Sequence, residues 1–248
     1  MRGRRSPARV LWNVLLGVCF ASLIGIVLIQ IEQYVLRHRS EQLLNDIQSL
    51  PLGRATFSDM QRLKQKWGSA GHYEDNCSEE SCTLDVLLTD LSERYPEILI
   101  ERPHLFHFFM LVGGRPARVG SKVVVEKGLI SGKSFQVAVG VPAYQAANGW
   151  WPDYTLIGNA RSVTELSPRL RAPAAHPDYV VGVPDGCDGP CREVHFVFAS
   201  SADPAIVNRF MQFDFSCLTR WIHPCRTEGD TMPGAWAQYE RDFGRTMN

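Results

Sequence analysis

The chain has 248 residues, of which 45% are hydrophobic and 21% are charged, with 26 basic side chains against 26 acidic ones. This composition excludes a disordered chain, a collagen-like repeat and a coiled-coil rod, because each needs a compositional bias that is absent here. A net charge of zero also argues against a nucleic-acid binder, which normally carries a basic excess. We therefore expect no nucleic-acid partner.

The N-terminal 31 residues have the pattern of a membrane anchor. Residues 1–9 contain four arginines and no acid, and residues 10–31 contain no Asp, Glu, Lys or Arg. A helix over residues 10–31 would be ~33 Å long, enough to cross a hydrocarbon core of roughly 30 Å. Trp12 and Tyr34 fall where interfacial aromatic residues usually lie. The sequence predicts a cytoplasmic stub over residues 1–9 and a transmembrane anchor, in contact with the lipid bilayer, over residues 10–31.

Three alternatives to a retained anchor are a buried core helix, a cleaved signal peptide and a lipoprotein signal. A core helix would rarely be this long without a charge. A signal peptidase would have to cut inside the apolar segment, since that segment continues to Ile31. Val18 is the wrong residue before Cys19 for a lipoprotein signal. The pattern therefore favours an uncleaved signal-anchor.

The arginines also predict the orientation of the anchor. Positive residues are retained on the cytoplasmic side, so the N-terminus should be cytoplasmic and the part after residue 31 should lie outside, in the periplasm or the extracellular space. Without the four arginines, 22 basic residues remain against 26 acidic ones, so the outer part is mildly acidic. No other segment approaches 18 apolar residues, and we predict a single-pass protein of the cell membrane.

A juxtamembrane helix is predicted over residues 32–50, which contain no Gly or Pro. Its apolar residues repeat along one seam, at Leu36, Leu43, Ile47 and Leu50. The seam either packs on the protein's own domain, which we favour, or forms a weak coiled-coil homodimer through residues 36–50.

Residues 51–248 are predicted to form one extracytoplasmic domain of the α+β class. A second helix follows Thr56, with Asp59 completing a loose capping box, and further helices are expected after Asp203 and Pro233. Strands are predicted where segments rich in Val, Leu, Ile and Phe are bounded by turn residues. These segments are residues 83–91, 99–112, 117–127, 135–141, 178–183 and 192–199. Short connections favour antiparallel pairing, so we expect a central antiparallel β-sheet with helices at both ends.

Six cysteines outside the anchor fall into three close groups, which are Cys77 and Cys82, Cys187 and Cys191, and Cys217 and Cys225. An oxidising compartment permits disulfides. Sequence leaves the connectivity open, but pairing within each group is simplest because loop closure is easiest between near neighbours. Zinc is disfavoured since no group has the usual two-residue spacing, and so is a redox dithiol, since no Cys-x-x-Cys opens a helix. All six are structural disulfide candidates, and no metal is expected.

Three other motifs resemble functional sites but lack a required feature. Residues 128–134 resemble a P-loop, yet only three residues separate the glycines, Gly128 and Gly132, and the next segment alternates like a strand. His104 and His107 would point to opposite faces of a strand and could not share a metal ion. His195 is expected to be a half-buried sheet histidine. No motif places a nucleophile beside a base, so we assign no catalytic residue and no cofactor.

An aromatic loop containing Trp150, Trp151 and Tyr154 is a candidate binding loop. If exposed, it could stack on a sugar ring or hold a proline-rich peptide. Such residues more often anchor a loop to the core. The triplet that begins at Asn76 is formally a glycosylation sequon, with meaning only in a eukaryotic secretory pathway.

Together these features lead us to expect a membrane-anchored, disulfide-stabilised interaction or binding domain for an unknown protein or glycan partner. The alternative is a membrane-anchored envelope hydrolase whose site is assembled from distant residues. A flat sheet face with exposed Trp150 and Trp151 would favour binding. A cleft that brings a histidine within hydrogen-bond reach of a nucleophile and an acid would favour the hydrolase.

Overall fold

The computed structural model describes residues 7–99, 102–142, 152–166, 176–183, 191–220 and 225–244. These residues form a seven-stranded sheet with the order β1-β2-β3-β4-β5-β7-β6. The strands are β1 (Gly71–Tyr73), β2 (Ser81–Thr89), β3 (Ala117–Glu126), β4 (Leu129–Pro142), β5 (Pro152–Val163), β6 (Tyr179–Gly182) and β7 (Cys191–Ala199). The α-helices are α1 (Pro7–Gln48), α2 (Phe57–Trp67), α3 (Leu91–Arg94), α4 (Pro96–Leu99), α5 (Pro103–Leu111), α6 (Pro204–Phe210) and α7 (Pro233–Phe243). Short 3-10 helices are η1 (Gly68–Ala70), η3 (Phe215–Leu218) and η4 (Glu228–Asp230). The fold class is therefore α+β, as the sequence predicts.

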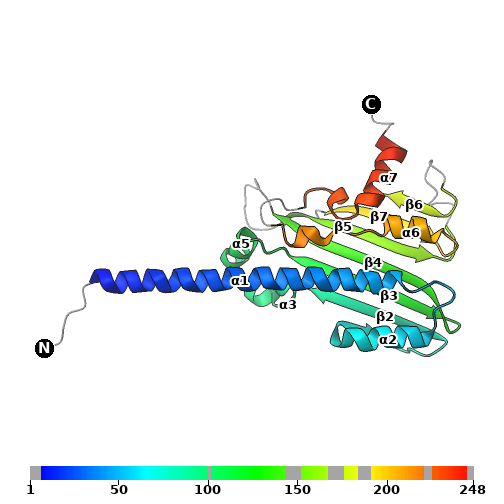
Figure 1. Cartoon of the computed structure of the whole chain (residues 1–248), viewed down its shortest axis with the longest axis horizontal. Coiled ribbons are helices and arrows are strands. Elements are labelled where there is room, and N and C mark those ends of the chain that lie inside the picture. Colours follow the sequence, from blue (N-terminus) through cyan, green and yellow to red (C-terminus); the bar gives the residue numbers. More distant parts are fainter. Residues whose placement is uncertain are drawn as a thin grey trace.

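Helix α1 joins the predicted anchor and the predicted juxtamembrane helix in one unbroken element (Figure 1). Its N-terminal part projects beyond the rest of the molecule and exposes apolar side chains from Leu11 to Ile31. Among the described helices, α1 is the one long and apolar enough to cross a membrane by length and composition. Its C-terminal part is different, because Gln33, Leu43 and Ile47 are completely buried. One helix thus contains a bare apolar half and a half that belongs to the core.

The seam of α1 packs on the protein's own sheet. Leu36, Leu43 and Ile47 belong to the main core cluster, and Leu50 packs against it. Ser40 lies on the same seam and is fully buried, with its hydroxyl donating to the carbonyl of Leu36 at 2.8 Å. These contacts lie within one chain.

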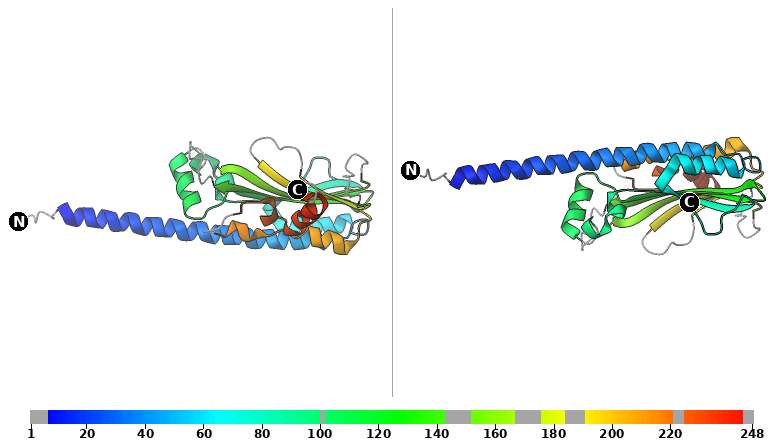
Figure 2. Two further views of the ribbon diagram at one scale, coloured as in Figure 1. Left: turned by 90° about the horizontal axis from the view of Figure 1, so that it is seen from above. Right: turned by 90° about the horizontal axis from the view of Figure 1, so that it is seen from below.

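One face of the sheet carries four of the helices and the main core cluster. Figure 2 shows α1, α2, α6 and α7 on that side of the strands. The core cluster joins alternate residues of the strands, such as Leu84, Val123 and Phe135, to Ile47 and Met60 of the helices. The opposite face receives the other alternate residues of β2, β3 and β4. This two-sided pattern follows from the alternation of side chains along a strand.

The predicted antiparallel sheet is wrong in one strand pair, and the sheet is mixed. The pairs β1–β2, β2–β3, β3–β4, β4–β5 and β6–β7 are antiparallel, whereas β5 and β7 are parallel. The reason is the path of the chain after β5. It first passes to β6, at the edge of the sheet, and then returns through β7, which fills the position between β5 and β6. A strand inserted in this way runs in the same direction as β5.

The prediction of a strand over residues 99–112 is also wrong, because this segment contains the end of α4 and all of α5. Pro103 occupies the first turn of α5, where its missing N–H has no intrahelical partner to lose. The buried residues Phe106, Phe109 and Val112 are three apart, which is a helical spacing. His104 and His107 both lie on this helix. The argument that they would point to opposite faces of a strand therefore does not apply to them.

Two strands were not predicted, and β5 is the longer of them. Its inward positions are Leu156, Gly158 and Ala160, while polar residues such as Asn159 and Arg161 alternate with them. Small inward residues weaken the apolar signal of a strand. Gly158 is required here because a Cβ would come within 2.9 Å of the Met232 side chain.

The P-loop-like segment forms a hairpin and caps α1. Lys127 and Gly128 have positive φ angles of 55° and 78° and make the tight turn between β3 and β4. The ammonium of Lys133, on β4, donates to three carbonyls at the end of α1, those of Ile47 (3.1 Å), Gln48 (3.3 Å) and Leu50 (2.8 Å). A cation at a helix C-terminus satisfies carbonyls that have no intrahelical donor. Burial lowers the pKa of Lys133 to about 8.

Candidate functional site

The candidate site lies on the side of the sheet opposite α1, α2, α6 and α7, which we call the open face. Its side chains come from strands β1 to β5, and the strand register aligns them in two rows that run across the strands. The first row is His72, Asp85, Lys122, Ser134 and Arg161, and the second is Leu87, Gly120, Gln136 and Asn159. Directly opposite residues in a sheet have Cβ atoms about 5 Å apart. The open face is therefore a continuous surface, mostly of polar side chains.

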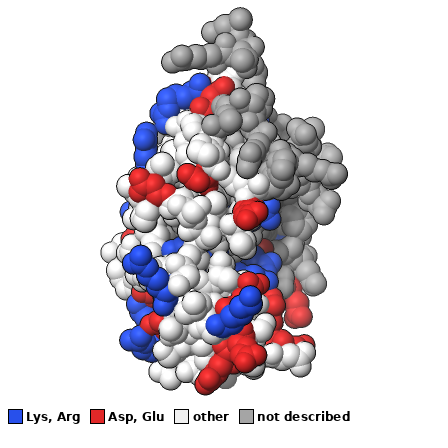
Figure 3. Space-filling view, turned by 90° about the vertical axis from the view of Figure 1, so that its right-hand side faces the viewer, with Lys and Arg blue, Asp and Glu red and all other residues white. Residues whose placement is uncertain are grey.

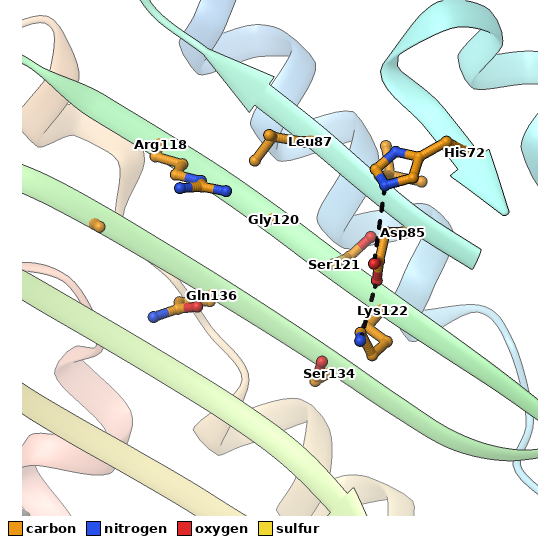
Figure 4. Close-up of a pocket in the computed structure, with 11 residues that line it drawn as sticks. His72, Asp85, Leu87, Arg118, Gly120, Ser121, Lys122, Ser134 and Gln136 are labelled. Carbon is orange, nitrogen blue, oxygen red and sulfur yellow. Dashed lines mark ion pairs between the residues drawn. The ribbon is translucent and has the colours of Figure 1, made fainter. Parts of the chain in front are cut away.

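A shallow depression of about 570 Å³ lies on the open face over strands β1 to β4 (Figure 4). Gly120 and Ala138 form part of its lining. The surface is hollowed there because neither residue has a long side chain. Figure 4 shows that His72, Asp85 and Lys122 lie at one end of the depression, and that Arg118 lies toward the other.

The first end is a network of charged groups at the surface. The Lys122 ammonium lies 2.6 Å from Glu74 Oε1 and 3.7 Å from Asp85 Oδ1, and His72 Nε2 lies 4.0 Å from Asp85 Oδ2. The hydrogen bond with Glu74 raises the pKa of Lys122 and lowers that of Glu74. Lys122 therefore keeps its proton at neutral pH and is a hydrogen-bond donor rather than a base. Exposed ion pairs of this kind contribute little to stability.

The second end offers hydrogen-bond donors to a ligand. Arg118 and Gln136 are exposed, and within the described part of the chain neither makes a hydrogen bond or ion pair with another protein group. They come from neighbouring strands, and both line the depression (Figure 4). A guanidinium and a carboxamide in this position can hydrogen-bond an acceptor-rich ligand.

His195 is half-buried, as the sequence predicts, and it lies at the β6 edge of the sheet rather than in the depression. The register pairs it with Asn159 on one side and with Gly182 on the other. Gly182 is needed for this packing, because a Cβ there would come within 2.8 Å of His195 Nε2. Burial lowers the pKa of His195. Burial thus favours the neutral form of the imidazole, which packs against Gly182.

A second histidine–carboxylate pair joins the segment before β6 to α7. His176 Nε2 lies 3.2 Å from Asp242 Oδ2, and Gln238 donates to the other carboxylate oxygen at 2.9 Å. The imidazole stacks on Tyr179 with 4.2 Å between the ring centroids. Among the described residues, no hydroxyl or thiol is hydrogen-bonded to the pair. Those residues also contain no group of three or more His, Cys, Asp or Glu side chains that could hold a metal ion.

The described disulfide candidates do not line the depression. Cys77 and Cys82 have Cα atoms 4.3 Å apart and form a disulfide across the turn before β2. Cys217 and Cys225 form a second one with Cα atoms 5.2 Å apart. Cys191 is disulfide-bonded as well, and Cys187 lies outside the described residues. Cys19 is free and exposed on α1.

The predicted aromatic binding loop falls mainly outside the described residues. Trp150 and Trp151 are not among them. Tyr154 lies in β5, paired with Val141 of β4.

Sequence reasoning missed Arg118, Lys122 and Gln136, which line the depression. Their signal was present, because polar residues alternate with buried valines and Phe135 along β3 and β4. Alternation indicates only that a strand has a solvent-facing side. It does not show which strands lie side by side, and so it cannot reveal a surface.

Comparisons with known proteins identify no relative: no family model matches the chain, and neither a curated protein nor a solved structure does.

Proposed function

We propose that the protein is a single-pass, membrane-anchored binding module whose domain lies outside the cytoplasmic membrane and whose open face binds a carboxylate-bearing ligand. The proposed anchor rests on the difference in burial between the two halves of α1. Most side chains from Leu11 to Ile31 are apolar and exposed, whereas Leu43 and Ile47 of the same helix are fully buried. Exposed apolar surface of this extent needs a lipid environment.

The charge and the cysteines support an outer location for the domain. Four arginines precede the apolar segment, and such residues are retained on the cytoplasmic side. Cys77 and Cys82, and Cys217 and Cys225, are paired, and disulfides persist in oxidising compartments.

The ligand class follows from the donors in the depression. Arg118 and Gln136 have no protein partner in the described part of the chain, and Lys122 is held protonated by Glu74. A guanidinium binds a carboxylate through two parallel hydrogen bonds. The shallow shape suits a ligand that lies flat across the strands, such as a segment of an acidic glycan or peptide.

The alternative of an envelope hydrolase needs a nucleophile beside a histidine and an acid. In the described part of the depression His72 contacts Asp85, and Lys122 is not a base. No observation on these residues favours the hydrolase over the binding module.

Topology is tested by fusing alkaline phosphatase or β-galactosidase after residue 60 and after residue 244 in a bacterial host. We expect phosphatase activity and no β-galactosidase activity at both positions. Active β-galactosidase would place the domain in the cytoplasm and contradict the proposal.

Ligand binding is tested with the full chain in lipid nanodiscs against matched panels of acidic and neutral glycans and peptides. We expect binding to acidic members, and a loss of about tenfold to a hundredfold in affinity for an Arg118→Ala/Gln136→Ala variant. Arg62→Ala is the control, since Arg62 is an exposed arginine of α2 that pairs with Asp59, away from the depression. Equal binding of acidic and neutral members, or equal losses in both variants, would contradict the assignment of the open face.

A further inference from the structure

Helix α5 exposes an apolar surface at one end of the domain. Leu105, Phe108 and Leu111 are 42%, 36% and 66% exposed, and Ile98 of the neighbouring α4 is 54% exposed. We call these four residues the α5 face. Large apolar side chains grouped on a surface usually mark a contact with another molecule or with a membrane.

Helix α5 is fixed to the domain by buried side chains and hydrogen bonds. Phe106 and Phe109, on the other side of the helix, are buried, and a Cβ at Gly114 would clash with the Phe109 ring. The guanidinium of Arg115, which is 2% exposed, donates to the carbonyls of Met110 at 3.1 Å and Gly114 at 2.7 Å. The exposed side chains therefore belong to a fixed helix whose inner side is already packed.

A direct contact places α5 beside the end of the apolar segment of α1. Gln30 Nε2 donates to the carbonyl of Val112, the residue that follows α5, at 2.7 Å. Gln30 is in the last turn of the apolar segment over residues 10–31. Figures 1 and 2 show α5 at the end of the domain from which the bare part of α1 projects. If α1 crosses a membrane, α5 lies at the level where it leaves the bilayer.

The chemistry of α5 suits the boundary between headgroups and hydrocarbon. The helix contains no Asp, Glu, Lys or Arg, and the exposed residues His104 and His107 alternate with the apolar side chains. Aromatic rings and polar-tipped side chains are favoured at this depth of a bilayer. The opposite end of the domain carries interspersed basic and acidic side chains (Figure 3). The two ends therefore differ in the way expected of a membrane-facing and a water-facing end.

We propose that the α5 face inserts into the outer leaflet of the membrane that α1 crosses. Lipid is its occupant, and the domain is docked on the bilayer by a second contact besides α1. This inference rests on the proposed membrane anchor, so the experiment below tests the anchor and the docking separately.

The test places the photo-crosslinker benzoylphenylalanine at single positions of the full chain in phosphatidylcholine–phosphatidylglycerol vesicles. The positions are Leu105 in the α5 face, Leu15 in the bare part of α1, and Leu129 in β4. Leu129 is a matched control, because it is 41% exposed against 42% for Leu105 and lies beside the C-terminal end of α1, where Gly53 donates to the carbonyl of Ile130 at 2.8 Å. We expect lipid adducts at Leu15 and Leu105, and about tenfold less at Leu129, which lies in water.

The outcomes separate the two proposals. Adducts at Leu15 without adducts at Leu105 would overturn the docking and leave the anchor in place. Absence of adducts at Leu15 would overturn the anchor. Protein–protein adducts at Leu105 would assign the α5 face to a second copy and overturn the lipid contact.

A second variant separates insertion from mere closeness to the bilayer. With the crosslinker at Phe108, the change Leu105→Glu places a charge in the α5 face, and we expect the lipid adduct to fall about tenfold or more because acidic residues disfavour the membrane. Leu129→Glu, with the crosslinker again at Phe108, should leave the adduct unchanged. An equal yield from both variants would show that Phe108 is close to lipid without being inserted, which overturns the proposal.

Discussion

The division of α1 into a bare half and a core half gives a direct prediction about stability. Leu43 and Leu28 lie on the same helix, and Leu43 is fully buried whereas Leu28 is 58% exposed. We expect Leu43→Ala to destabilise the domain strongly and Leu28→Ala to leave its unfolding unchanged. The chemical change is identical, so the comparison isolates the effect of the position on the helix.

The magnitude for Leu43 follows from its surroundings. Replacing Leu by Ala removes the transfer free energy of its buried methyl and methylene groups, about 2–2.5 kcal/mol. The cavity adds a further term, because Leu43 belongs to the core cluster between α1 and the sheet and these rigid elements relax only partly. The expected loss is about 3–4 kcal/mol in total. In a domain of this size it corresponds to a fall in Tm of roughly 6–16 °C.

Thermal unfolding of the full chain in detergent micelles, followed by circular dichroism, measures this difference. The measurement should be repeated over a wide range of protein concentration. A core position within one chain gives a concentration-independent loss, whereas a homodimer seam would give a Tm that rises with concentration. A difference between Leu43→Ala and Leu28→Ala below about 1 kcal/mol would refute the argument, since every buried Leu→Ala cost lies above this value.

Three further predictions concern single residues. The pKa of Lys133 is lowered from 10.5 to about 8 in the folded protein, so between these pH values the unfolded chain holds a proton that the folded one lacks. Stability should therefore rise with pH in this range. Lys133→Met should remove this rise when unfolding is measured as a function of pH, and an unaltered profile would contradict the argument. Gly182→Ala should lower the unfolding free energy by about 1–3 kcal/mol through a clash with His195. The control Gly120→Ala should be nearly neutral, because the closest neighbours lie 3.9 Å from the added Cβ. Equal effects of the two variants on Tm would count against the packing of Gly182 on His195. Thiol titration of the denatured, unreduced protein should detect Cys19 alone, with six more thiols after reduction, and finding all seven cysteines reactive beforehand would contradict the disulfides.

Local signals explain which elements could be predicted from the sequence. The capping box at α2 forms as expected, with the Thr56 backbone N–H donating to Asp59 Oδ2 at 2.7 Å. Helices α6 and α7 begin at Pro204 and Pro233, where proline at the first turn is favoured. Each of these features is decided by residues a few positions apart, so a single sequence contains the whole signal.

The missed features depend on contacts between distant residues. Helix α5 has an aromatic-rich sequence that equally fits a buried strand, and it is fixed by Arg115 and by the contact with Gln30. The parallel pairing of β5 with β7 depends on the route of the chain through β6. The depression depends on the register that places Gln136 opposite Gly120. None of these contacts can be predicted from a local sequence pattern.

The direction of α1 also determines where a ligand on the open face would lie. Figure 1 shows α1 running along the length of the sheet. If α1 crosses the membrane, the long axis of the sheet points away from the bilayer and the open face is turned to the side. Arg118 follows Val112, which contacts Gln30 of α1, by six residues. Six residues of extended chain span at most ~20 Å, so Arg118 lies within about this distance of the contact between Val112 and Gln30, at the end of the apolar segment of α1. If the proposed anchor crosses the membrane, a ligand that binds Arg118 must reach the space next to the bilayer, and this favours molecules that are themselves close to the membrane surface.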